Sequence, residues 1–116
     1  MNKRDCQNTS TPTHEHLAKL LGDRDRLVVC NNTTLTRYDP QGSITVRLHG
    51  HPIIVAEPNG EVTLSSCGYR TVTTKDRLNR FLPYGVRVWQ ENFRWYLHIY
   101  GQDVQEFEDG ITVRNS

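Results

Sequence analysis

The sequence of 116 residues lacks the segments that would place it in or across a membrane. No apolar run approaches the roughly 20 residues of a transmembrane helix. The polar N-terminal segment MNKRDCQNTSTPT also lacks the apolar centre of a secretory signal peptide. We therefore expect a protein without a membrane partner that is not secreted.

Cysteine is scarce, with three residues and no Cys-x-x-Cys pair. An odd number without close pairs fits free thiols in a reducing compartment better than a disulfide framework. Two His-x-His pairs, His14/His16 and His49/His51, suggest zinc as an alternative, but no cysteine pair completes a ligand set. The sequence therefore predicts no metal site and no cofactor.

A charge excess of either sign is also missing, since Lys+Arg 14 against Asp+Glu 13 gives a net charge of +1. No global field then attracts nucleic acid or a membrane surface, and any electrostatic site must be local. Residues 69–87 carry five basic side chains and one acidic one, whereas residues 91–110 carry five acidic side chains and one basic one. The centre of the chain is thus the basic part, and the segment that follows is acidic.

Hydrophobic periodicity predicts an α+β fold that is mainly antiparallel β. Residues 1–12 are polar and unpatterned, so we expect a mobile arm followed by a single domain over residues 13–116. A short helix is expected from Thr13 as N-cap to Gly22 as its stop. Strands are expected at 27–30, 34–38, 44–48, 52–56, 61–64, 86–90, 93–100, 104–108 and 111–114. The strand at 27–30 should be buried, and the strand at 44–48 should have one solvent-exposed face.

The expected architecture is a small antiparallel sheet of six to eight strands, made of hairpins and rolled over one central helix at 74–82. Asn59-Gly60 is the strongest hairpin signal, because a type I′ turn needs positive φ at both central residues. Residues 48–64 and 97–113 share a layout of Leu-His, a glycine break, a strand, an acidic turn and a closing strand. They form either a weak internal repeat around the helix or two hairpins that look alike by chance.

The stretch SSCGYRTVTTKDRLNRFL at residues 65–82 concentrates the side chains suited to ligand binding. Thr73 or Thr74 is expected to cap the helix, whose buried face would comprise Leu78, Phe81 and Leu82. The basic and amide side chains of Lys75, Arg77 and Asn79 should then point away from the core.

A helix N-terminus with hydroxyl and basic side chains receives a phosphate or carboxylate well. The candidate ligand-binding residues are Tyr69, Arg70, Thr71, Thr73, Thr74, Lys75 and Arg77. The alternative is a capped surface helix with solvated basic residues. A Walker A loop is excluded, because Gly68 and Lys75 lack the second glycine that this motif places directly before its lysine.

Two further features have both a structural and a functional interpretation. Cys67 lacks an identifiable base, so we expect a partly buried free thiol rather than a nucleophile. In the strand at 93–100, alternation places Trp95 and Leu97 on one face and Tyr96 and His98 on the other. One face should be core, while the other either covers the sheet or stacks a base.

The segment Gly-Tyr-x-Thr-x-Thr-Thr-Lys-x-Arg-Leu-Asn at residues 68–79 resembles a family of short uncharacterised proteins of tailed bacteriophages. The resemblance extends from residue 31 onward and leaves out the first thirty residues. Where that family has Asn-Ser-Gly-Gly-Trp, this chain has Ser65-Ser66-Cys67-Gly68-Tyr69. The resemblance implies a phage origin and a location in the cytoplasm of an infected bacterial host, and it assigns no catalytic residue.

From these observations we predict a non-enzymatic, phage-encoded binding protein. It would hold a phosphate-bearing ligand, a nucleotide or a nucleic acid, and interfere with host defence. The alternative is a structural or protein-interaction module that forms a homo-oligomer or binds a host protein. A small hydrolase that uses His49 or His98 with a carboxylate is a third hypothesis, but no motif spacing supports it.

Overall fold

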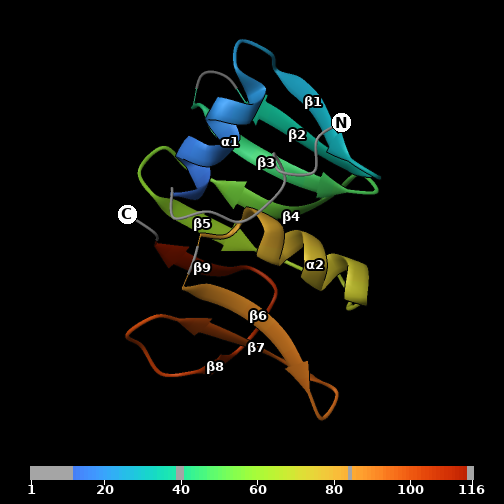
Figure 1. Cartoon of the computed structure of the whole chain (residues 1–116), viewed down its shortest axis with the longest axis vertical. Helices are drawn as coiled ribbons and strands as arrows, with labels where there is room; N and C mark the ends of the chain where they lie inside the picture. Colours follow the sequence, from blue (N-terminus) through green and yellow to red (C-terminus); the bar gives the residue numbers. More distant parts are fainter. Residues whose placement is uncertain (1–11, 39–40, 84, 115–116) are drawn as a thin grey trace.

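The computed structural model describes residues 12–38, 41–83 and 85–114, which form two helices and nine strands. Figure 1 shows a six-stranded antiparallel sheet in the order β1-β2-β3-β4-β5-β9 and a three-stranded one in the order β6-β7-β8. In chain order the elements are α1 (Thr13–Leu21), β1 (Arg26–Cys30), β2 (Thr33–Tyr38), β3 (Ser43–Leu48), β4 (His51–Ala56), β5 (Glu61–Leu64), α2 (Val72–Phe81), β6 (Val86–Glu91), β7 (Arg94–Ile99), β8 (Gln105–Glu106) and β9 (Ile111–Arg114). The predicted class, α+β with antiparallel hairpins, a short N-terminal helix and a central helix, is confirmed. The predicted mobile arm lies outside the described residues, apart from Pro12.

The expectation of one rolled sheet is wrong, because the strands divide between two sheets. Periodicity indicates where strands lie but not which strands pair. After β5 the chain leaves the large sheet for α2 and the small sheet, and it returns only at β9, where Val113 pairs with Val62. The Gly110 amide donates to the Leu64 carbonyl at 2.8 Å and so fixes the point of return.

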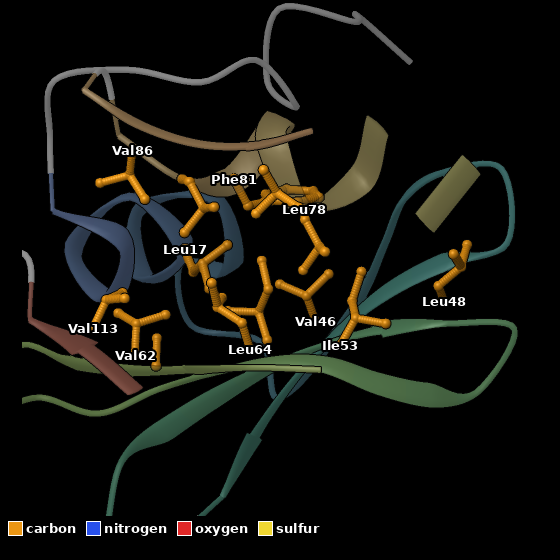
Figure 2. Packing of buried hydrophobic residues seen from close by; sticks show 14 of the residues in the cluster. Leu17, Val46, Leu48, Ile53, Val62, Leu64, Leu78, Phe81, Val86 and Val113 are labelled. Atoms are coloured by element: carbon orange, nitrogen blue, oxygen red, sulfur yellow. The ribbon is translucent and has the colours of Figure 1, made fainter. Parts of the chain in front are cut away.

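One face of the six-stranded sheet carries the hydrophobic core. A row of directly paired, fully buried side chains crosses four strands: Leu35, Val46, Ile54 and Leu64. Figure 2 shows Leu17 of α1, Phe81 of α2 and Val86 of β6 on the other side of this core, above the sheet. Burying each such side chain stabilises the fold by about 1.5–3 kcal/mol. The core therefore joins both helices and the start of the small sheet to the large one.

A β-bulge in β4 alters the alternation of the side chains there. Val46 pairs with Ile54 and Arg47 pairs with Pro52, so Ile53 is an extra residue in β4. Both Ile53 and Ile54 are buried, although neighbours in a regular strand point to opposite faces. The bulge thus brings a second isoleucine to the interior near the β3–β4 turn.

The N-terminal helix begins and ends close to the predicted bounds. Gly22 is its C-cap at φ 61°, as expected, and its amide donates to the Ala18 carbonyl. The expectation for Thr13 is wrong, because Pro12 is the N-cap and caps without a side-chain hydrogen bond. Thr13 is instead fully buried, and its hydroxyl donates to the Phe81 carbonyl at 3.3 Å. The threonine therefore links α1 to α2.

The central helix begins two residues earlier than predicted. Thr71 is the N-cap, and its Oγ1 accepts a hydrogen bond from the Thr74 amide at 3.1 Å. The cap is therefore neither Thr73 nor Thr74, and the sequence alone left several threonines eligible. The helix ends at Phe81, because Leu82 precedes a proline, which disfavours helical backbone, and is extended at φ −84° and ψ 147°.

The similar segments at 48–64 and 97–113 are not equivalent hairpins. β4 and β5 pair with each other in the first segment. In the second, β8 pairs with β7 in the small sheet, whereas β9 pairs with β5 in the large one. The likeness of the two segments is thus limited to their sequences.

The hairpin at Asn59-Gly60 is confirmed, but its turn is not type I′. Only Gly60 has positive φ there, at 96°, and the Glu57 amide donates to the Glu61 carbonyl across a three-residue loop. Positive φ at two consecutive central residues occurs instead at His49-Gly50 and at Asn92-Phe93. The first of these two turns forms part of the candidate site.

Two burial predictions are also wrong. β1 is an edge strand with Val28 54% exposed, so it is not a buried strand. In β3, Thr45 lies on the face opposite Val46 but is only 3% exposed. The face predicted to be solvent-exposed is therefore covered at this position. Both errors have one cause, because burial depends on the neighbours that a strand acquires in the sheet.

Candidate functional site

A pocket of about 390 Å³ lies between the β3–β4 turn and the start of α2. Its volume is in the range of small-molecule binding sites. Leu48 and Ile53 supply its apolar lining, and Ile53 is the extra residue of the bulge. The remaining lining residues are His49, His51, Ser66, Tyr69, Thr71, Thr73 and Thr74. The pocket thus combines apolar surface with imidazole and hydroxyl groups, and no carboxylate lines it among the residues that the structure describes.

The β3–β4 turn positions the two histidines at the pocket. Leu48 pairs with His51, so His49 and Gly50 form a two-residue turn with φ of 52° and 83°. Two successive positive φ values are typical of a type I′ turn, which favours glycine or asparagine over histidine. The His49 amide donates to the Asn32 carbonyl at 2.8 Å, which connects this turn to the turn between β1 and β2.

An aromatic contact joins the two sides of the pocket. The rings of His51 and Tyr69 lie with their centroids 4.8 Å apart at an interplanar angle of 34°. Tyr69 belongs to the segment that precedes α2, whereas His51 opens β4. Tyr69 remains more than half exposed, so part of its ring is available to a ligand.

The segment before α2 is held in place by Asp109. The backbone N–H and the hydroxyl of Ser66 both donate to Asp109 Oδ1 at 2.8 Å. Burial raises the pKa of Asp109, but these two bonds, the charge of Arg70 and the Gly68 N–H together lower the pKa below its ordinary value of 3.8. The ionised carboxylate therefore stabilises the wall of the pocket that contains Ser66.

Cys67 lies beside the pocket and is a partly buried free thiol, as predicted. Its Sγ donates to the Pro52 carbonyl at 3.0 Å, and its amide donates to the Ser65 hydroxyl at 2.9 Å. The residue has φ of 52°, a left-handed conformation that glycine adopts without strain. The family resemblance places a glycine at this position, and the backbone geometry explains why glycine fits it.

The start of α2 contributes hydroxyls and amides to the pocket. Thr71, Thr73 and Thr74 are the N-cap and the second and third helical residues, and all three line the pocket. The Thr71 cap satisfies the Thr74 amide, while the first-turn amides of Val72 and Thr73 have no intrahelical acceptor. The positive end of the helix dipole therefore lies at the pocket.

The structure brings four of the seven predicted ligand-binding residues to the pocket, namely Tyr69, Thr71, Thr73 and Thr74. Arg70 lies elsewhere, because its guanidinium packs over Trp95 and Phe107, 5.3 and 5.4 Å from the ring centroids. It also forms an ion pair with Asp109 at 3.9 Å. Its role in the structure is to connect the segment before α2 with the small sheet.

Lys75 and Arg77 also make contacts within the fold. Lys75 Nζ donates to Gln90 Oε1 at 2.9 Å and lies 5.7 Å from the Trp95 ring centroid. Arg77 Nε donates to Thr33 Oγ1 at 2.8 Å, and its guanidinium pairs with Asp76. The expectation that these side chains simply point outward is therefore wrong.

Asn79 likewise faces a strand instead of solvent. Its side-chain amide donates to the Val88 carbonyl at 2.8 Å and accepts from the Val88 amide at 2.9 Å. These two bonds take the place of a neighbouring strand at the edge of β6. The predicted buried face of α2, by contrast, is confirmed for Leu78, Phe81 and Leu82.

Reasoning from sequence misses the β3–β4 side of the pocket. The spacing of His49 and His51 suggests only a metal pair, and no group of three or more potential metal ligands occurs among the described residues. Periodicity assigns Leu48 and Ile53 only to strands. The available signal is the sequence His49-Gly50-His51 between two apolar strands. It predicts a tight turn in which one histidine precedes the glycine and the other follows it.

Two helices packed on antiparallel sheets, with a pocket at the start of the central helix, define a small α+β protein with a potential ligand site. The profile of the Kyanoviridae Gp96 protein family matches residues 13–114, so the chain belongs to this family of cyanophage proteins of unknown function. The resemblance to bacteriophage proteins is thus confirmed. The match includes α1 and β1, so the expectation that the first thirty residues fall outside the family is wrong from residue 13 onward.

Comparison of the chain with curated proteins and with solved structures gives no match. The described helices also include none that is long and apolar enough to cross a membrane. The candidate site therefore has to be interpreted from its own geometry.

Proposed function

We propose that this protein binds a small phosphate-bearing ligand, specifically a nucleoside monophosphate, without transforming it. The observation that carries this proposal is the pocket of about 390 Å³ at the N-terminus of α2, whose described lining residues supply hydroxyl and imidazole groups and no carboxylate. This is the more specific form of the binding function expected from sequence.

The phosphate is assigned to the α2 end of the pocket. The helix dipole and first-turn amides favour an anion at this end. Thr71 and Thr73 add hydroxyls that donate hydrogen bonds, and His49 and His51 supply imidazole donors across the pocket. These groups together provide several donors for the oxygens of one phosphate.

The base is assigned to the aromatic and apolar side of the pocket. Tyr69 is partly exposed and in contact with His51, so it offers a ring face for stacking. Leu48 and Ile53 provide apolar surface next to it. A ligand with a flat heterocycle and a phosphate matches both halves of the pocket.

A single phosphate fits the site better than a polyphosphate. Arg70, Lys75 and Arg77 are engaged with Asp109, Gln90 and Thr33, so none of them supplies its charge to the pocket lining. The attraction for an anion then comes from the helix terminus and neutral or weakly basic donors. Sequestering a nucleotide signal of the infected host would interfere with host defence, and the phage origin of the family is the support for this part of the proposal.

Isothermal titration of the full chain with AMP, GMP, CMP and UMP tests the proposal, with the matching nucleosides as ligands that lack the phosphate. The informative variant is Thr73→Glu, because a carboxylate at the second helical position favours the helix but repels a phosphate. We expect Thr73→Glu to lose at least tenfold in affinity, which corresponds to about 1.4 kcal/mol. Thr112→Glu on β9 is the matched control and should bind like the parent.

Two outcomes would overturn the proposal. The first is the absence of binding heat for all four nucleotides with the parent protein. The second is equal affinity for the parent and Thr73→Glu, which would place the ligand elsewhere on the chain.

A protein-interaction module is the second candidate function. Phe93 favours it, because this side chain is 96% exposed at the β6–β7 turn and has φ of 66°. A large apolar side chain kept in a strained and solvated position is typical of a contact with a partner, either a host protein or another copy. For another copy, static light scattering should show a mass above 13.4 kDa in the parent at high concentration and a monomer for Phe93→Gly.

A further inference from the structure

The three-stranded sheet has one buried face and one that bears aromatic and basic side chains. Val88, Trp95 and Leu97 are buried on the inner side. On the opposite side, β6 and β7 place Arg87 directly across from His98 and Trp89 directly across from Tyr96. Arg87 is exposed and the other three are half-buried, so this outer face offers ring surface and donors to a ligand.

The two outer aromatic rings lie together and border a hollow. The ring centroids of Trp89 and Tyr96 are 5.9 Å apart at an interplanar angle of 33°. A hollow of about 220 Å³ is lined by Arg87, Trp89, His98 and Val104. It lies on the small sheet and shares no lining residue with the larger pocket.

Arg87 and His98 differ from the other basic side chains near this sheet in their polar contacts. Among the described residues, neither side chain has a hydrogen-bond or ion-pair partner. The guanidinium of Arg70, by comparison, forms an ion pair with Asp109, and that of Arg77 pairs with Asp76. Arg87 therefore presents a positive charge beside the Trp89 ring that no described carboxylate pairs with.

Two carboxylates of this face, Glu91 and Glu106, lie outside the row formed by Arg87 and His98. Glu91 pairs with Arg94, and Glu106 pairs with Tyr96 across β7 and β8. Arg94 Nη1 lies 3.7 Å from Glu106 Oε1, so Arg94 forms an ion pair with Glu106. The face is therefore divided, with free positive charge at the Arg87 end and the aromatic pair next to it.

We propose that this outer face binds a short stretch of single-stranded nucleic acid. A base stacks on Trp89, next to Tyr96, and the adjacent phosphate contacts Arg87 and His98. Side chains two residues apart on one strand face are separated by about 7 Å, which lets one nucleotide contact both rows. Aromatic stacking with basic contacts to the backbone is the physical basis of single-strand binding without strong sequence preference.

Intrinsic fluorescence provides the test, because Trp95 is only 1% exposed and Trp89 is the tryptophan available for stacking. The full chain is titrated with a single-stranded dT decamer, with the corresponding duplex and with a glutamate decamer as an acidic peptide. We expect the single strand to quench the emission and to bind more tightly than either of the other two.

Arg87→Gln is the informative variant, and Arg26→Gln on β1 is its matched control, since Arg26 is also exposed and lies on the other sheet. Arg87→Gln should lose at least tenfold in affinity for the single strand and lower the slope of log K against log salt by about 0.7. Arg26→Gln should retain both the affinity and the slope. Thermal unfolding of both variants establishes that the fold is kept.

Three results would each overturn the inference: no binding of the single strand, equal affinity for the parent and Arg87→Gln, or stronger binding of the acidic peptide, which would assign the face to a protein partner. The inference does not depend on the nucleotide pocket. Thr73→Glu should leave single-strand binding unchanged, and Arg87→Gln should leave nucleoside monophosphate binding unchanged, so failure at one site is distinguishable from failure at the other.

Discussion

The two sheets of this protein are held in the fold by different forces. The six-stranded sheet contributes a continuous apolar face to the core, with rows such as Leu35, Val46, Ile54 and Leu64. The three-stranded sheet contributes a smaller apolar face, and polar side chains from α2 and the segment before it attach to its edge and its rings, as with Asn79 at Val88 and Arg70 at Trp95. The large sheet is thus expected to be insensitive to loss of a polar contact, whereas the small sheet depends on several of them.

Trp95→Ala is expected to cause the largest loss of stability, because it acts on the small sheet and its polar contacts. Trp95 is buried between the small sheet and the side chains of Arg70 and Lys75, so its truncation should lower the free energy of unfolding by about 3–5 kcal/mol. Urea denaturation measures the loss. Trp89→Ala removes the same side chain from the outer face of the sheet and should cost only about 1 kcal/mol. Equal losses for the two variants would contradict the assignment of inner and outer faces.

Asn79→Ala should have the next largest effect. Removing this amide leaves the N–H and the carbonyl of Val88 without their partner at the edge of β6, which should cost about 1–3 kcal/mol. Hydrogen exchange should show faster exchange of the Val88 amide, with little change in β3. Asn31→Ala, at an exposed turn in the large sheet, is the control and should leave Val88 exchange unchanged. If Val88 exchange is the same in parent and Asn79→Ala, helix α2 does not protect this edge.

Asp109 makes the link between the sheets depend on pH. Its folded-state pKa is lowered below the ordinary value of 3.8, so its stabilising effect is present above that value and is lost as the pH falls through the folded pKa. The urea midpoint of the parent should therefore decrease as the pH falls below 3.8. Asp109→Asn should lower the unfolding free energy by about 1 kcal/mol at neutral pH and show a shallower decrease in acid.

The control for this prediction is Asp23→Asn, because Asp23 is exposed and precedes β1, which lies at the opposite edge of the large sheet from β9. This variant should retain the decrease of the parent in acid. An acid decrease in Asp109→Asn as steep as that of the parent would show that other carboxylates account for it.

Phe93→Gly should have the smallest effect on stability, and unlike the variants above it should stabilise the protein. Glycine relieves the strain of positive φ at position 93, while the exposed phenylalanine loses little packing, so the variant should be more stable by up to about 1 kcal/mol. The thermal midpoint measures the gain. Arg94→Gly at the next position is the control and should destabilise the protein, because Arg94 lies in regular strand β7 and pairs with Glu91. A lower midpoint for Phe93→Gly, measured at a concentration where light scattering shows the parent as a monomer, would contradict the relief of strain.

Local patterns are sufficient to predict much of the fold. The leucines before Gly22 and the face formed by Leu78 and Phe81 follow helical spacing, and the described structure has both helices. Alternation also places Trp95 and Leu97 together on one side of β7, which is the buried side. These features depend on residues close in sequence, which is why the sequence alone predicts them.

The candidate site can be predicted only in part, because its two walls come from different parts of the chain. Capping chemistry identifies the threonines near the start of α2. The destinations of Arg70 and Lys75 depend on Trp95 and Gln90, which reach them only after the small sheet has packed. The bulge that brings Ile53 to the pocket depends in turn on the register of β3 and β4.

The pairing of β9 with β5 also has a consequence for synthesis on the ribosome. Strands β1 to β5 pair with their neighbours in chain order, so each hairpin can close as it leaves the exit tunnel. The free edge of β5 stays open until α2 and the whole small sheet have been made, because its partner is Ile111–Arg114. We therefore expect the nascent chain to expose an unpaired strand edge until residues 111–114 have left the tunnel, and chaperones that recognise such edges would act during that interval.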